Sequence, residues 1–171
     1  MATFEGRNGF TVLVIEPTDG WAFCAQGHRH WGRAGAAGLL LHRAGPEGCE
    51  LLLQHRARWS HHGGTWGTPG GALHHGESAS DGALREIREE LGLQPDDVVL
   101  GAQSVDDHGG WSYTTVLARP ARSIEAGDLR LDGESDGAAW LPLAGLQQVD
   151  LHPGLAASLD RLRPLLEVTC Q

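Results

Sequence analysis

The stretch that decides the fold reads GALHHGESASDGALREIREELGL and runs from Gly71 to Leu93. An α-helix over residues 78–91 turns by about 100° at each residue. Glu86, Glu89 and Glu90 therefore share one face of that helix. Like charges three and four positions apart repel, so a purely structural helix gains nothing from this arrangement. Because a hard divalent cation prefers carboxylate ligands, the stretch predicts a metal site on a helix.

The boundaries of this helix are also encoded locally. Ser78 is a suitable N-cap, and Asp81 three residues later imitates a capping box. Gly92 is the expected stop after the last helical residue. Gly82 has no evident explanation, since glycine inside a helix costs about 1 kcal/mol relative to alanine. An apolar stripe that repeats every four residues predicts the face that packs on a sheet: Ala79, Ala83, Ile87 and Leu91.

Runs of β-forming residues lie on both sides of the helix. Residues 36–42 and 50–54 form one predicted hairpin, and residues 98–104 and 111–117 form a second. Strands are also predicted over residues 10–16 and 137–141, and an amphipathic helix over residues 155–166 that Pro164 breaks near its end. Together these elements predict an α/β (α+β) fold with a mixed sheet covered on both faces.

The composition favours one soluble domain. A chain of 171 residues can bury close to 70% of its unfolded surface, and no apolar run is long enough for a membrane span. The net charge of −9 argues against a nucleic-acid polymer as partner. Three scattered cysteines, Cys24, Cys49 and Cys170, predict reduced thiols rather than a disulfide framework. With no signal-peptide pattern at the N-terminus, a cytoplasmic location is expected.

The 71–93 stretch resembles the signature box of the Nudix hydrolases at nine fixed positions: Gly71, Glu77, Arg85, Glu86, Ile87, Glu89, Glu90, Gly92 and Leu93. The resemblance covers roughly residues 34–166 and implies an αβα sandwich with a mixed central sheet. Residues 34–171 are therefore expected to form the Nudix domain, with residues 1–33 as an N-terminal strand and loop extension packed on it. A solvated charged face is the competing interpretation of a Glu-rich helix, which the complete pattern disfavours.

The resemblance also implies a reaction. Nudix enzymes hydrolyse a nucleoside diphosphate linked to another group, with a divalent cation and an activated water. Glu86 matches the general base of well-studied members, although members differ in this role. Arg85 lies to one side of the acids and is expected to orient a carboxylate or Glu77. The predicted catalytic residues are Glu86, Glu89 and Arg85.

The metal ligands follow from the same resemblance. Glu89 and Glu90 carry over, as does the backbone carbonyl of Gly70 just before the box. Glu134 lies where related hydrolases supply a further ligand, although an isolated acid in such a loop is more often structural or solvated. Mg²⁺ is the expected cofactor, with Mn²⁺ as a substitute. The predicted ligands are Gly70, Glu86, Glu89, Glu90 and Glu134.

Candidate substrate-binding residues flank the box. The chain has no lysine, so any cationic side chain that contacts substrate is arginine or histidine. Aromatic side chains could stack on a base, but core packing explains them equally well. Loop histidines are more often simply exposed. The candidates are Arg56, His62, Trp66, Trp111 and Tyr113.

Cys24, His28 and His30 form a Cys-x3-His-x-His pattern ahead of the predicted domain. The pattern could contribute to a zinc site, but no fourth ligand is evident and the spacing is unusual. Packing or hydrogen bonding within the loop is the favoured interpretation.

The sequence thus predicts a Nudix pyrophosphohydrolase acting on a small nucleotide. The lead-in Trp66-Gly-Thr-Pro-Gly-Gly71 is shared with nucleotide-cleaning, MutT-like members, so a normal, deoxy- or oxidised nucleoside triphosphate is the first choice. Residues 52–56 fit the lead-in of the coenzyme A type only in part, which leaves a coenzyme A or dinucleotide pyrophosphatase open. A non-hydrolytic sensor of a nucleotide metabolite is the rival class, and the complete box favours an enzyme over it. Nudix enzymes often dimerise, which leaves a homodimer open.

Overall fold

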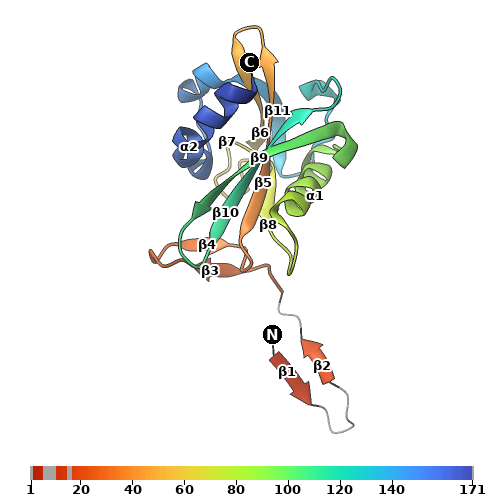
Figure 1. Ribbon diagram of the computed structural model, residues 1–171, viewed down its shortest axis with the longest axis vertical. Helices are drawn as coiled ribbons and strands as arrows, with labels where there is room; N and C mark the ends of the chain where they lie inside the picture. Colours follow the sequence, from red (N-terminus) through yellow and green to blue (C-terminus); the bar gives the residue numbers. More distant parts are fainter. Residues whose placement is uncertain (1, 6–10, 15–16, 171) are drawn as a thin grey trace.

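The computed structural model describes residues 2–5, 11–14 and 17–170. It is a three-layer arrangement in which helix α1 (Ala79–Leu91) and helix α2 (Pro153–Thr169) lie on opposite sides of a mixed sheet (Figure 1). The predicted αβα fold with a mixed central sheet is confirmed. Among the described residues, no helix is long and apolar enough to cross a membrane.

The central sheet has the strand order β11-β6-β5-β10-β9. β5 and β10 are parallel, and the other neighbours along this path are antiparallel. Two short strands of the same sheet are not part of this linear order: β7 pairs with β6, and β8 pairs with β5. The strands are β5 (Ala36–Gly45), β6 (Gly48–Arg56), β7 (Trp66–Gly67), β8 (Gly70–Ala72), β9 (Val98–Asp107), β10 (Ser112–Pro120) and β11 (Ser135–Pro142). Both predicted hairpins and the strand near residue 140 are confirmed, each somewhat longer than expected.

Each face of the sheet has its own apolar core. Leu39, Leu41 and Leu52 belong to the core that includes the buried residues of α1. Leu40 and Leu51 belong to the core that includes the buried residues of α2. Because successive side chains of a strand point to opposite faces, a central strand covered on both sides becomes a continuous leucine run.

Helix α1 begins and ends where the sequence predicts. Ser78 is the N-cap, and its side chain accepts a hydrogen bond from the Asp81 backbone N–H. Gly92 is the C-cap in the left-handed region, with φ of 72°. The structure also explains Gly82, because a Cβ there would collide with the Leu73 side chain in the loop before the helix. Gly82 therefore lets that loop pack closely on α1.

Helix α2 contradicts the predicted break at Pro164. The helix runs from Pro153 to Thr169 and contains Pro164 in its interior. Leu162 and Leu166 on either side of the proline are fully buried. Proline inside a helix costs about 3 kcal/mol relative to alanine, because it removes a backbone hydrogen bond and clashes with the preceding turn. The packing of the two leucines offsets this cost. Three short 3-10 helices complete the helical elements: Pro95–Asp97, Ala126–Asp128 and Leu143–Gln148.

The N-terminal part forms two small hairpins. β1 (Ala2–Glu5) pairs with β2 (Thr11–Val14), and β3 (Trp21–Phe23) pairs with β4 (Arg29–Trp31). The predicted strand over residues 10–16 is present as β2 at its centre, and residues 10, 15 and 16 lie outside the described residues. Residues 17–33 contain the β3–β4 hairpin. The division into a 1–33 extension and a 34–171 domain stays a prediction.

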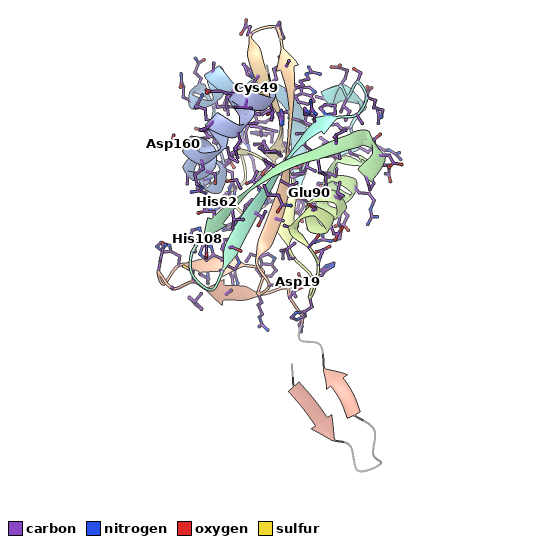
Figure 2. The ribbon with its side chains drawn as sticks, viewed as in Figure 1. Asp19, Cys49, His62, Glu90, His108 and Asp160 are labelled. Atoms are coloured by element: carbon purple, nitrogen blue, oxygen red, sulfur yellow. A yellow bond between two sulfur atoms is a disulfide. The ribbon has the colours of Figure 1, made fainter. Side chains whose placement is uncertain are left out.

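The prediction of three reduced thiols was wrong for two of the cysteines. Cys49 and Cys170 form a disulfide between β6 and the end of α2, and their Cα atoms are 5.4 Å apart. Figure 2 labels Cys49 near the β5–β6 turn. The pairing could not be read from the sequence, because the fold brings together residues 121 positions apart. Cys24 is buried with a free thiol.

Candidate active site

Helix α1 holds two of its three box acids in the protein interior. Glu86 and Glu90 are only 9% and 8% exposed, whereas the Glu89 side chain is 51% exposed. The predicted common face is therefore divided into an inner pair and an outer acid. A buried carboxylate is costly unless it is paired, hydrogen-bonded or neutralised by a cation.

The Glu90 carboxylate is held by two neutral donors. Its Oε2 accepts hydrogen bonds from Gln54 Nε2 at 3.0 Å and from the Gly70 backbone N–H at 3.1 Å. Burial, followed by the nearby charge of Glu86, raises the pKa of Glu90 to about 8. Ser135 Oγ donates to Gln54 Oε1 at 3.1 Å, which fixes the amide. Gln54 was missed in the sequence, where its only signal is a lone polar residue after three leucines.

The Arg85 guanidinium lies among the other acids of the box. It donates to both Glu77 oxygens, from Nε at 2.9 Å and from Nη2 at 3.1 Å. Nη1 contacts Glu86 and lies 3.2 Å from Glu89 Oε2, and Nη2 also donates to the Ala72 carbonyl. These bonds lower the pKa of Glu77, while burial raises the pKa of Glu86 despite the Arg85 contact. Arg85 thus contacts the residues that it was expected to orient.

Two glycines allow the sheet to approach these carboxylates. A Cβ on Gly71 would lie 2.5 Å from Glu86 Oε1. A Cβ on Gly70 would lie 2.7 Å from both the Ala37 carbonyl oxygen and the Tyr113 hydroxyl. Any side chain at either position would displace the acid or the neighbouring strand. The close approach also places the Gly70 backbone N–H beside Glu90. The role of the Gly70 carbonyl as a metal ligand stays a prediction.

Among the candidate substrate-binding residues, Tyr113 is influenced by the charges of the box acids. Its hydroxyl hydrogen-bonds with the Thr68 side chain. Burial raises the pKa of Tyr113 to about 12, and the charges of Glu90 and Glu86 contribute to the increase. The positive charge of Arg56 acts in the opposite direction on the same hydroxyl. The Tyr113 hydroxyl is therefore influenced both by the acids of α1 and by Arg56 at the end of β6.

The loop between β6 and β7 gathers cationic and aromatic side chains. Arg56 Nε donates to the His61 carbonyl at 2.9 Å. The ring centroids of His62 and His152 are 4.8 Å apart. Burial, followed by the charges of His62 and Arg56, lowers the pKa of His152 to about 4. Trp66 packs against the core beneath α2, which is the structural alternative to base stacking.

Trp111 and Glu134 lie in different surroundings. The Trp111 ring stacks on His30 at a centroid distance of 4.0 Å, and its Nε1 donates to the Gly32 carbonyl. Glu134 is exposed at the start of β11, and its backbone carbonyl accepts from Ala57 N–H at 2.8 Å. The substrate and metal roles of these two residues stay predictions.

The donor set of the box fits a hard divalent cation. All candidate ligand atoms are oxygens, from Glu86, Glu89, Glu90 and the Gly70 carbonyl, and Mg²⁺ prefers such ligands. The buried Glu90 carboxylate, with only neutral hydrogen-bond donors at Oε2, is a position where a cation would offset the cost of burial.

Comparison with known proteins identifies the family. Residues 32–162 match the NUDIX domain model. The chain belongs to the Nudix family. It therefore carries a Nudix hydrolase domain; members of this family act on small nucleotide substrates and generally depend on a divalent cation.

Several relatives are similar over most of this chain. The "Nucleoside triphosphate pyrophosphatase/Nudix hydrolase fusion protein" of Bifidobacterium longum is 42% identical over 87% of the chain, which spans 33% of that protein. The "Putative 8-oxo-dGTP diphosphatase 3" of Mycobacterium tuberculosis is 43% identical over 85% of the chain and 69% of its own length. The crystal structure of the Nudix hydrolase RenU from M. smegmatis has a TM-score of 0.78 at 38% identity and covers 90% of this chain and 98% of that one.

Proposed function

We propose that this protein hydrolyses a pyrophosphate bond in a nucleoside triphosphate and that Mg²⁺ is its cofactor. The observation that carries the proposal is the buried pair Glu86 and Glu90 packed against the Gly70–Gly71 backbone. Two interior acids, one of which (Glu90) accepts hydrogen bonds from neutral donors alone, are typical of a site that receives a cation and a polyphosphate.

The roles of the side chains follow from their surroundings. Glu86 accepts the proton of the attacking water, because its burial raises the pKa toward the working range of a general base. Arg85 fixes the orientation of Glu86 and Glu89 through its own bonds to Glu77. Glu89, Glu90 and the Gly70 carbonyl would hold the cation. When bound, a divalent cation neutralises phosphate oxygens and lowers the pKa of water.

The proposed substrate is a purine deoxynucleoside triphosphate with an oxidised base, 8-oxo-dGTP being the first to test. Support comes from the name of the M. tuberculosis relative and from the Trp66 to Gly71 lead-in. Arg56 and His62 at the β6–β7 loop are the proposed phosphate contacts, and Tyr113 or Trp111 the proposed base contact. A coenzyme A or dinucleotide substrate is an alternative outcome of the same assay.

Release of phosphate and pyrophosphate over a nucleotide panel, with Mg²⁺ or Mn²⁺, tests the proposal. Glu86→Gln and Glu90→Gln should each lower turnover by about 10²–10⁴-fold while the fold is retained. Glu167→Gln, which changes an exposed acid on α2, is the matched control and should leave turnover unchanged. Unchanged rates in both box variants would contradict the assigned roles.

The rival function is a nucleotide sensor. Tight binding of one panel member without turnover of any would favour it.

The cytoplasmic location and the homodimer stay predictions, and light scattering coupled to size-exclusion chromatography tests the assembly.

A further inference from the structure

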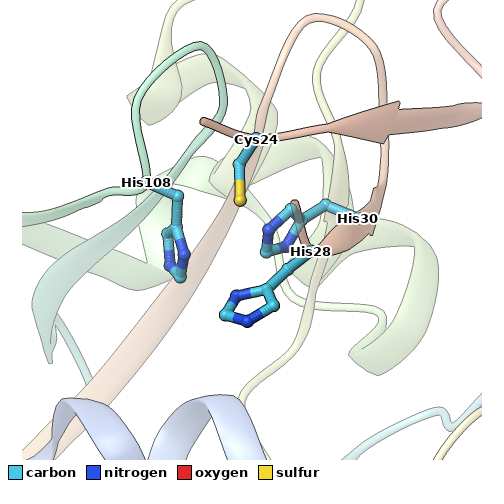
Figure 3. A group of neighbouring side chains, drawn as sticks. All are labelled: Cys24, His28, His30 and His108. Carbon is cyan, nitrogen blue, oxygen red and sulfur yellow. The ribbon is translucent and has the colours of Figure 1, made fainter. Parts of the chain in front are cut away.

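Four potential metal ligands meet at the end of the domain that carries the β3–β4 hairpin. They are Cys24, His28 and His30 from this hairpin and His108 from the loop between β9 and β10. One ligand atom from each side chain lies within 4.8 Å of all the others. Figure 3 shows the Cys24 sulfur and the three rings pointing toward a common centre.

The spacing suits a small tetrahedral ion. Bond lengths of about 2.0–2.3 Å to nitrogen and sulfur place tetrahedral ligand atoms roughly 3.3–3.6 Å apart. Side chains already within 4.8 Å therefore need only rotamer adjustments to close around zinc. One thiolate and three imidazoles favour Zn²⁺ over Mg²⁺, which prefers oxygen ligands.

Backbone hydrogen bonds fix the β3–β4 hairpin and attach it to the β9–β10 loop. Cys24 N–H donates to the His28 carbonyl at 3.0 Å, and Gly27 N–H donates to the Cys24 carbonyl at 2.9 Å. Ala25 N–H donates to the Gly109 carbonyl at 2.7 Å, directly beside His108. The fourth ligand is thus fixed relative to the first three by a main-chain hydrogen bond between distant segments.

Two ring nitrogens of the cluster lack a partner. Within the part of the chain that the structure describes, His30 Nε2 and His108 Nδ1 are buried and make no hydrogen bond. Native proteins rarely leave buried polar atoms unsatisfied, so each such atom needs an explanation. In a neutral ring with the proton on the opposite nitrogen, each of these atoms carries a free lone pair, and a metal ion would satisfy them together.

The outer sides of both rings are already held. His108 Nε2 lies 3.3 Å from Asp106 Oδ2, and Arg161 Nη2 lies 2.9 Å from the same oxygen. A carboxylate on the far nitrogen fixes the tautomer that leaves Nδ1 available, as is usual for metal-binding histidines. His30 is fixed by its stacking on Trp111.

We propose that Cys24, His28, His30 and His108 bind one structural zinc ion that joins the β3–β4 hairpin to the β9–β10 hairpin. Four protein ligands close a tetrahedral coordination sphere, which is typical of structural rather than catalytic sites. The site is separate from the Nudix box: Figure 2 shows His108 near the β3–β4 hairpin, away from Glu90 on α1.

Metal analysis of the full-length protein after dialysis against a weak chelator tests the site. The wild type should retain about one zinc per chain. Cys24→Ser and His108→Asn should each lose most of it. His75→Asn, an exposed histidine outside the cluster, and Glu90→Gln in the box should both retain it. Zinc content that is unchanged in Cys24→Ser and His108→Asn, or lost in Glu90→Gln, would overturn the assignment.

Cobalt substitution in the wild type gives a readout that does not depend on variants folding. Co²⁺ in this site should show a thiolate-to-metal charge-transfer band and the intense visible bands of tetrahedral coordination, neither of which Co²⁺ in an octahedral all-oxygen site produces. Zinc added to metal-depleted protein should raise the melting temperature by roughly 5–10 °C at a hundredfold excess over Kd. A wild-type chain that takes up neither zinc nor cobalt on titration refutes the proposal.

Discussion

The guanidinium of Arg85 donates two hydrogen bonds to the carboxylate of Glu77, from Nε to Oε1 at 2.9 Å and from Nη2 to Oε2 at 3.1 Å. The pair joins helix α1 to the loop that precedes it. Both side chains are mostly buried, so the two bonds are well shielded from solvent. The remaining nitrogen of Arg85 is thereby directed at Glu86 and Glu89.

Arg85→Lys should lower turnover by roughly 10–100-fold, the usual effect of losing an outer partner of a metal-site carboxylate. Lysine keeps the charge but cannot form the two-pronged contact with Glu77. Steady-state kinetics check the change, with circular dichroism to verify folding. Arg88→Lys, an exposed substitution on the same helix, is the control and should have no effect. Full activity of Arg85→Lys would show that charge alone is sufficient.

Gly82→Ala should destabilise the protein although alanine is the better helix former. Propensity favours alanine by about 1 kcal/mol, but the new methyl group would collide with Leu73, and such overpacking costs about 1–3 kcal/mol. Urea denaturation measures the difference. The double variant Gly82→Ala with Leu73→Ala should recover part of the loss relative to Leu73→Ala alone. Independent, additive effects in this cycle would contradict the contact.

Pro164→Ala should stabilise the protein by about 1–3 kcal/mol. Pro164 is exposed inside helix α2, so alanine sacrifices little packing and restores a backbone hydrogen-bond donor. Pro153→Ala is the matched control, since Pro153 stands at the first turn, where proline is well tolerated. Thermal melts of both variants compare the two positions. A larger gain at Pro153 would contradict this account of the helix.

The sequence predicts the elements whose signals are local. The Ser78 cap, the Gly92 stop and the apolar stripe of α1 are short-range patterns, and the helix follows them closely. Pro164 wrongly predicts a helix break because the burial of Leu162 and Leu166, which stabilises the helix on both sides of the proline, depends on a sheet formed by residues far away in the sequence. Local propensity is a weak prior where tertiary packing is strong.

The site shows the same division. Box spacing brings Glu86 and Glu90 to one helix face, but only the fold reveals that Gln54 and the Gly70 amide are the neutral hydrogen-bond donors to Glu90. His108 is the clearest case, because no spacing rule connects it with Cys24 across most of the domain. Contacts between hairpins depend on sheet register, which a single sequence does not encode locally.

The pH dependence of stability should reveal the buried Glu90. In the folded chain without metal its pKa is about 8, well above the ordinary value of 4.5. Below pH 4.5 both states carry the proton and Glu90 has no effect. Between pH 4.5 and 8 only the unfolded state loses the proton, so stability falls as pH rises, by a few kcal/mol in total.

Glu90→Gln should remove this loss, because the amide oxygen can still accept from Gln54 and Gly70 but carries no charge. In the presence of a chelator, the free energy of unfolding of the variant should therefore be about 2–4 kcal/mol higher than that of the wild type at pH 8. The two values should be equal near pH 5. His152, whose pKa is lowered to about 4, contributes an opposite slope at acidic pH, which the comparison cancels because both chains carry it. Excess Mg²⁺ should narrow the difference at pH 8 by stabilising only the wild type. Parallel stability curves for the two chains would mean that Glu90 is already charged in the folded protein, and that its burial does not create the demand for a cation.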